Sequence, residues 1–187
     1  MNYYILQQDP RIPNQPGILR SPEEIEPTDW IDGRVLPEPP GPLRFQLQPR
    51  SGRYRGCIIG GLVTLFHKIL IDELLRLGID NFQHFPVELE TPDGEIETPY
   101  SLINIIGLIE AVDEDNSILE RWDDGSIDQL YSFKIDPDKA KGKNMFRILE
   151  EPTLIIIDQT LYEGLLAFNP PGVMMLPTES YEGWAIS

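Results

Sequence analysis

The longest apolar stretch of the chain lies near its middle, in residues 100–115, and is bounded by acidic residues. Isoleucine dominates this stretch, Pro99 precedes it and Gly107 interrupts it. Because β-branched residues favour extended backbone, the pattern predicts a long strand that is buried on both faces at the centre of a sheet. A buried helix is the alternative, since a run of about a dozen apolar residues fits either element.

Alternation and helical spacing predict further elements on both sides of this stretch. The predicted strands are residues 2–6, 43–48, 82–90, 129–135, 145–149 and 173–176. Leucine spacing between Leu62 and Leu77 predicts one helix, which Gly78 should end. Residues 159–168 form the other predicted helix, with Asp158 as its N-cap.

Within residues 82–90, Pro86 predicts an edge position or a bulge, because proline cannot donate to a ladder. The turn sequence of residues 91–94 supplies a fixed φ and then a glycine. It predicts an antiparallel hairpin between residues 82–90 and the central stretch.

Two segments, residues 69–90 and 154–179, share a plan of aliphatic run, Ile-Asp pair, short helix, glycine break and strand. In this comparison Asp72 and Asp158 are the expected N-cap residues of the two short helices. The plan favours two matching helix–strand units that flank a central antiparallel sheet, which is an α+β fold. Chance agreement of cap and break chemistry is the alternative.

Residues 7–50 contain ten of the 18 prolines. Because proline removes a backbone donor and fixes φ, this segment is predicted to be a wrapping arm with little regular structure. Ser21 and Pro22 predict a single helical turn within it. The expected anchors are its large apolar residues, Trp30, Ile31, Val35 and Leu36. A proline-rich ligand for a partner protein is the alternative interpretation.

A length of 187 residues with 41% hydrophobic residues is enough for one domain with a sizeable core. We expect a single domain over residues 1–187, in which residues 1–50 supply a strand and the proline-rich arm and residues 51–187 supply an α+β core. The one cysteine, Cys57, excludes an internal disulfide framework and is expected to be a buried apolar side chain. No signal-peptide pattern or membrane-length apolar run is present, so the expected location is the cytoplasm.

Charge is the strongest compositional signal, with 31 acidic against 15 basic residues and a net charge of −16. Such a surface repels nucleic-acid phosphates and anionic membranes, which argues against both as partners and favours a basic protein. Eight carboxylates gather in residues 110–128, where Arg121 is the one base. We name this set the acid belt; its members are Glu110, Asp113, Glu114, Asp115, Glu120, Asp123, Asp124 and Asp128.

The belt and the two histidines resemble several kinds of chemical site. Asp113, Asp115 and Ser117 have the spacing that opens a calcium loop, but the glycine and closing glutamate of that pattern are missing. His67 and His84 without a neighbouring cysteine do not predict a zinc site. A hydrolytic carboxylate pair needs a cleft between its members, and it is kept as the enzyme alternative. No catalytic residue, cofactor or metal site is predicted.

The blocks at residues 2–6, 70–89, 100–117 and 145–177, in this order, resemble the immunity protein 11 family. Val112-Asp113 followed by Ser117, and Phe146-Arg147 leading into the last helix, carry most of the resemblance. It implies a non-enzymatic protein that is encoded beside a bacterial polymorphic or contact-delivered toxin and neutralises it by binding. The resemblance supplies no catalytic residue and does not define the activity of the toxin.

The sequence therefore predicts a stoichiometric, non-catalytic immunity protein whose partner is a cognate toxin encoded nearby. The acid belt is the predicted contact surface, because carboxylates can occupy the basic active site of a nuclease-like toxin in place of phosphates. A structural or adaptor module that docks through the proline-rich arm is one alternative. A small carboxylate-dependent hydrolase is the other.

Overall fold

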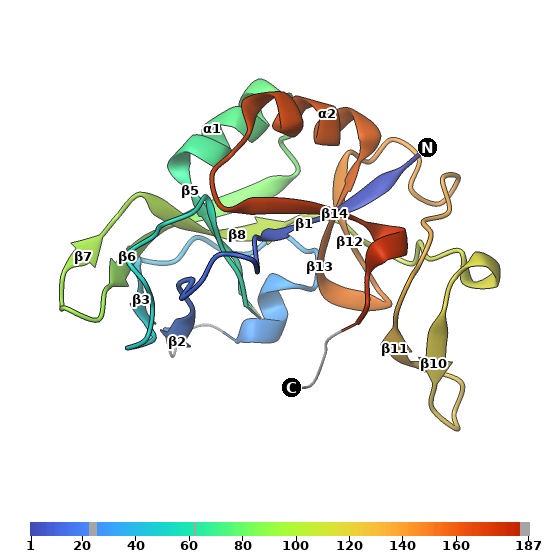
Figure 1. Ribbon diagram of the computed structural model, residues 1–187, viewed down its shortest axis with the longest axis horizontal. Coiled ribbons are helices and arrows are strands. Elements are labelled where there is room, and N and C mark those ends of the chain that lie inside the picture. The colour runs from blue at the N-terminus through green and yellow to red at the C-terminus, as the bar shows by residue number, and fades with distance from the viewer. Residues whose placement is uncertain (23–25, 62, 184–187) are drawn as a thin grey trace.

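Over the residues it describes, 1–22, 26–61 and 63–183, the computed structural model shows two β-sheets, a separate β-hairpin and two α-helices on one side of the sheets (Figure 1). The larger sheet has the strand order β2 (Ile18–Arg20), β3 (Leu43–Leu47), β6 (Phe82–Glu90), β8 (Tyr100–Ile105), β5 (Leu65–His67) and β4 (Ile58–Ile59), and β7 (Ile96–Glu97) pairs with β6. The smaller sheet has the order β14 (Val173–Pro177), β1 (Tyr3–Gln8), β13 (Glu151–Asp158), β12 (Met145–Ile148) and β9 (Leu108–Ile109). The hairpin is β10 (Leu119–Arg121) and β11 (Ile127–Leu130), and the α-helices are α1 (Lys68–Arg76) and α2 (Gln159–Phe168). Short 3₁₀ turns are η1 (Pro27–Trp30), η2 (Glu114–Asn116) and η3 (Thr178–Ser180).

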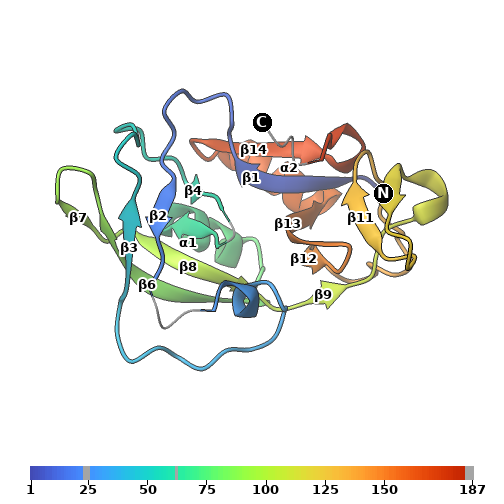
Figure 2. The ribbon, with the colours of Figure 1, turned by 90° about the horizontal axis from the view of Figure 1, so that it is seen from below.

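The predicted α+β class is confirmed, and most strand pairs are antiparallel. The central stretch is extended, and β8 pairs with β6 and lies inside the sheet as expected, with β5 as its unpredicted second neighbour. The prediction of one long strand over residues 100–115 is wrong, because β8 ends at Ile105 and β9 joins the other sheet beside β12. Gly107 makes this break, with a φ of +129° that side chains disfavour. Figure 2 shows β9 leaving the larger sheet at this point.

Each α-helix belongs to a strand–helix–strand unit whose two strands lie on either side of a third, antiparallel strand. The strands β5 and β6 flank β8, and β13 and β14 flank β1. The two helices lie side by side (Figure 1), since a Cβ at Gly164 would come within 2.8 Å of the Leu77 side chain. They share one core cluster, to which they contribute Leu70, Ile71, Leu74, Leu161 and Leu165.

The two predicted helix–strand units are thus present, but their helices start differently from the expectation. In α2, Asp158 is the N-cap and accepts a hydrogen bond from the backbone N–H of Leu161 at 2.8 Å. In α1 the N-cap is His67, whose Nδ1 accepts from the backbone N–H of Ile69 at 3.2 Å. Asp72, expected to be the cap, lies inside α1 and pairs with Lys68 at 2.6 Å.

This histidine cap makes the stability of α1 sensitive to pH. Burial lowers the pKa of His67 below its ordinary value of 6.5, and protonation removes the lone pair that accepts the bond. The contribution of the cap, about 1 kcal/mol, is therefore present above the unfolded-state pKa and is lost as the pH falls through the folded-state value. We expect wild type to lose about this much more unfolding free energy than His67→Asn between about pH 7.5 and pH 5 in urea titrations. Equal losses in the two proteins would contradict the assigned cap.

Some other element boundaries differ from the prediction, because the same pattern of apolar residues fits both a helix and a strand. The helix expected from Leu62 begins at Lys68, because residues just before it form β5, and Leu62 itself lies outside the described residues. Gly78, with a φ of +82°, ends α1 as predicted, and α2 has the predicted bounds. The strand expected over residues 129–135 ends at Leu130.

Pro86 does not mark an edge strand, because β6 has partners on both sides. Residues Phe82–Pro86 pair with β8, and Val87–Glu90 pair with β3. The proline lies where β6 changes its main partner, a place at which a missing N–H costs least. The turn after β6 is confirmed, with Gly94 at a φ of +82°.

The proline-rich arm wraps one side of the larger sheet (Figure 2). Trp30 is 6% exposed and packs edge-on against Phe85, with ring centroids 5.1 Å apart. The amide side chain of Gln83 accepts from the backbone N–H of Leu36 at 2.8 Å and donates to the backbone carbonyl of Leu36 at 2.9 Å. These two bonds satisfy backbone groups of the arm that have no strand partner.

Trp30 and Leu36 are therefore anchors of the arm as predicted, whereas Val35 is 67% exposed and was wrongly predicted to be one. Ile31 is half-buried. The helical turn expected after Ser21 and Pro22 falls on residues 23–25, which lie outside the described residues. Cys57 is 1% exposed and its pKa is raised to about 11 by burial, which confirms it as an apolar core side chain.

Candidate functional site

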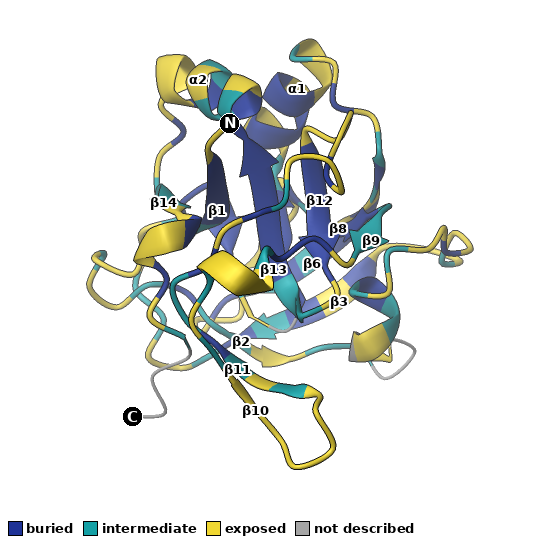
Figure 3. Cartoon of the chain, turned by 90° about the vertical axis from the view of Figure 1, so that its right-hand side faces the viewer, coloured by how far each residue is buried: buried dark blue, intermediate teal, exposed yellow. Residues whose placement is uncertain are grey.

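The acid belt occupies one side of the molecule, where the chain leaves β9, forms η2 and turns through the β10–β11 hairpin (Figure 1). Figure 3 shows the hairpin projecting from the body with most of its residues exposed. Seven of the eight carboxylates belong to exposed residues, and Asp113 is half-buried. The belt is therefore a solvent-facing surface that a partner can reach.

The base of the hairpin is fixed by apolar packing. Leu119 of β10 faces inward against a core cluster that includes Leu130 and Phe133, which are 2% and 0% exposed. Phe133 in turn meets the Tyr181 ring edge-on at a centroid distance of 5.7 Å. The hairpin therefore projects from a firm base, although its pairing involves only two strands.

Most of the belt is not neutralised by neighbouring bases. Glu110 lies 3.6 Å from Lys139, and Glu114 pairs with Arg121. Among the described residues, these are the only ion pairs of 4.0 Å or less that involve belt carboxylates. The members outside these pairs are Asp113, Asp115, Glu120, Asp123, Asp124 and Asp128.

Local hydrogen bonds hold several of these carboxylates in place. Asp113 accepts a bond from the Asn116 side chain at 2.9 Å. Asp124 accepts from the backbone N–H and the hydroxyl of Ser126 at 2.9 and 2.6 Å, and these bonds lower the pKa of Asp124. Because hydrogen bonds to the charged form favour it, Asp124 stays ionised well below neutral pH.

The structure brings some belt residues together and separates others. Glu120 and Asp128 face the hydroxyl of Tyr131, whose pKa is raised by desolvation first and by these two charges second. Asp123 and Asp124 lie at the tip of the hairpin, and Glu110 is apart from them beside Lys139. The belt is therefore a string of small acidic groups along one side of the molecule.

Two apolar residues of this surface were missed by the sequence analysis. Trp122 is 60% exposed and Ile118 is 63% exposed, whereas Leu119 between them packs inward. Period-two alternation around Leu119 is a signal that could have found Ile118, because it places Ile118 and Glu120 on the face opposite Leu119. It does not extend to Trp122, since the pairing of β10 with β11 shifts register between Glu120 and Arg121. The acidic surface therefore also carries two exposed apolar side chains.

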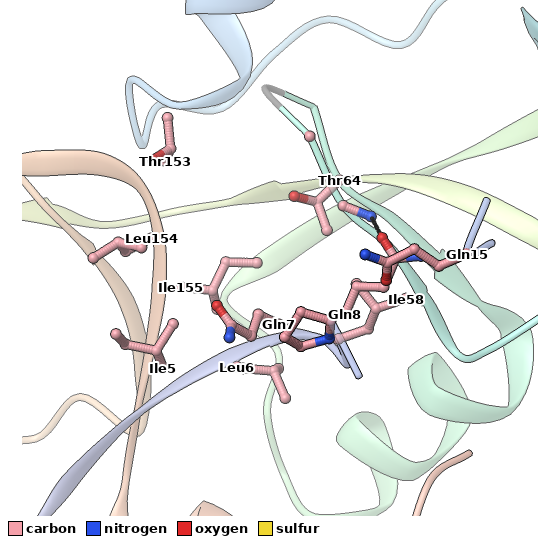
Figure 4. A pocket seen from close by; sticks show the side chains of 13 residues that line it. Ile5, Leu6, Gln7, Gln8, Gln15, Ile58, Thr64, Thr153, Leu154 and Ile155 are labelled. Carbon is pink, nitrogen blue, oxygen red and sulfur yellow. Dashed lines mark hydrogen bonds between the residues drawn. The ribbon is translucent and has the colours of Figure 1, made fainter. Parts of the chain in front are cut away.

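A cavity of about 310 Å³ lies at the seam between the two sheets, under the start of the arm (Figure 4). Strands β1, β4 and β13 contribute to its walls, whose polar groups are Gln7, Gln8, Gln15, Thr64 and Thr153 beside aliphatic side chains. No carboxylate lines it among the described residues. Where the pKa of a described carboxylate is shifted, at Asp9, Glu73 and Asp124, it is lowered, which is opposite to the shift that a carboxylic general acid needs.

Residues 1–22, 26–61 and 63–183 contain no group of three or more His, Cys, Asp or Glu side chains placed to hold a metal ion. Neither α-helix in these ranges is long and apolar enough to cross a membrane.

The fold and the surface together define a class, a small α+β protein that presents an acidic hairpin with two exposed apolar residues to the solvent. The model of the Immunity protein family (Imm11) matches residues 3–180, which is nearly the whole chain, and the protein therefore belongs to this family. No curated protein matches the chain. Membership in this family points to a role in immunity toward a toxin.

Proposed function

We propose that this protein binds a cognate toxin, encoded by a neighbouring gene, and neutralises it stoichiometrically and without catalysis. One observation carries the proposal: most carboxylates of the acid belt are exposed and unpaired on one projecting side of a chain with a net charge of −16. Such a surface attracts a basic protein and repels nucleic acid and anionic membranes. Residues 1–187 act in this proposal as one domain in the cytoplasm.

The belt would act by covering a basic surface of the toxin. A nuclease-like toxin binds phosphates with lysine and arginine, and carboxylates can occupy the same positions through charge-assisted hydrogen bonds. Asp123 and Asp124 at the tip of the hairpin reach furthest from the body, so they are the carboxylates best placed to enter such a site. Occupied in this way, the toxin cannot bind its substrate.

The arm offers less support for an adaptor function. Trp30 and Leu36 are buried against the larger sheet, and Gln83 satisfies the backbone of the arm. A segment held in this way is part of the core and is not presented to a partner. The hydrolase alternative likewise lacks a carboxylate with a raised pKa in the cavity of Figure 4.

The test uses the toxin domain of the neighbouring gene. Co-expressed with that domain, the protein is expected to co-purify with it and to restore growth of cells that the toxin otherwise stops. A catalytically inactive toxin variant should still co-purify, because binding needs the surface of the toxin and not its chemistry. Rescue of growth without any complex, under conditions that retain micromolar binding, would contradict the proposal.

A further inference from the structure

The β10–β11 hairpin departs from ordinary protein surface because an isoleucine and a tryptophan are exposed at the two ends of its first strand. Ile118 and Trp122 stand just before and just after β10, whose pairing with β11 shifts register between Glu120 and Arg121, and the backbone N–H of Tyr131 donates to the Ile118 carbonyl across the hairpin. Trp122 is 60% exposed, whereas Trp30 is 6% exposed in the core. Tryptophan exposed in this way is typical of the centre of a binding surface.

The hairpin holds Trp122 in a fixed turn. Its backbone N–H donates to the Ser126 carbonyl at 2.9 Å, and its carbonyl accepts from the N–H of Gly125 at 2.9 Å. Gly125 takes a φ of +86°, and the guanidinium of Arg121 bonds to its carbonyl as well as to Glu114. A tryptophan presented from a bonded turn loses little backbone freedom on binding, which favours affinity.

Carboxylates lie next to these two apolar residues in the chain. Asp123 and Asp124 follow Trp122 directly, and Glu120 lies between the two apolar residues in the sequence. An apolar centre with a charged rim is the usual arrangement of a protein–protein interface, in which the centre supplies most of the affinity. The negative sign of the rim selects a positively charged partner.

We infer that Trp122 and Ile118 are the residues that hold the toxin. They would insert into an apolar recess within a basic surface of that toxin. This inference rests on the proposed function and deepens it. The two components of the surface then have different kinetic roles: the carboxylates raise the association rate, and the indole of Trp122 slows dissociation.

The test measures both rate constants for wild type, Trp122→Ala and Trp122→Phe by surface plasmon resonance on the immobilised toxin domain. Trp122→Ala is expected to raise the dissociation rate about 30-fold or more and to change the association rate by less than about threefold. Trp122→Phe should lie between Trp122→Ala and wild type, because it keeps an aromatic ring. Leu166→Ala is the matched control, since Leu166 is a 54% exposed apolar residue on α2, away from the hairpin.

The possible outcomes test the proposed function and the role of Trp122 separately. Failure of wild type to bind the toxin would remove the proposed function itself. Wild-type binding with a dissociation rate unchanged in Trp122→Ala would overturn the anchor and leave the function standing. A similar rise in Leu166→Ala would also overturn it, because the effect would then not be specific to the hairpin. Urea titration of each variant is expected to give the wild-type midpoint, since the changed side chains are exposed.

Discussion

Changing Asp113, Asp115, Asp123 and Asp124 together to lysine is expected to slow association with the toxin by about 10- to 100-fold at low salt. The four positions are carboxylates without an ion-pair partner among the described residues, so no neighbouring base cancels their charge. Each change adds two charge units, which takes the net charge from −16 to −8. Attraction of this kind is screened within about 8 Å at physiological salt, so the variant should also lose most of the salt dependence of association.

A control with the same net charge separates the belt from the overall charge. Glu38, Asp80, Asp93 and Glu95 are exposed carboxylates outside the belt, and none of them has an ion pair among the described contacts. Their combined change to lysine gives the same net charge and is expected to slow association much less. Stopped-flow association rates at several salt concentrations measure both variants. If the two variants behave alike, the belt is only a solvated surface and the total charge governs the encounter.

Trp30→Ala is expected to lower the free energy of unfolding by about 3–5 kcal/mol. The side chain is 6% exposed and packs against Phe85 of β6 within the core of the larger sheet. Removing it leaves a cavity and releases the main contact of the arm, whose proline-rich backbone cannot compensate with a regular ladder. Urea unfolding followed by circular dichroism measures the change.

Trp122→Ala is the matched control for this change, because it removes the same side chain from an exposed position. It should stay within about 0.5 kcal/mol of wild type. Together the two variants separate the structural tryptophan from the interaction tryptophan. Wild-type stability of Trp30→Ala would show that the arm is not part of the folded core and would revive its interpretation as a docking segment.

Interactions between residues close in sequence made the exact bounds of some elements predictable. The helix α2 was predicted with its bounds, because Asp158 supplies an N-cap and Asn169 ends the helix in a left-handed conformation at a φ of 54°. The turn that contains Gly94 was predicted for a similar reason. In each case the deciding interactions lie within a few residues of sequence, so the sequence pattern contains them.

Elements whose structure depends on residues distant in sequence were predicted less well. Leu65 and Phe66 fit a helical stripe, but pairing with β8 holds them in a strand, and the helix starts only at Lys68. The break at Gly107 was missed because apolar residues continue on both sides of it while the backbone passes from one sheet to the other. Neither sheet partner is visible from sequence spacing.

The charge of the candidate surface was predictable from the sequence, but its exposed apolar residues were not. The carboxylates of the belt were identified from composition, and their exposure agrees with the expectation of a solvated, accessible surface. Trp122 was missed because sequence alone does not distinguish it from Trp30, which is buried. Only the inward packing of Leu119, established by the fold, shows which face of β10 meets the solvent.

The most direct measurement is a titration of toxin activity with purified protein at toxin concentrations well above the dissociation constant. The account predicts a linear loss of activity that ends at equal molar amounts of the two proteins, with recovery of active toxin when the complex is denatured and the toxin refolded. Complete inactivation by a small molar fraction of the protein, with the toxin permanently modified, would contradict it, since only a catalyst acts repeatedly.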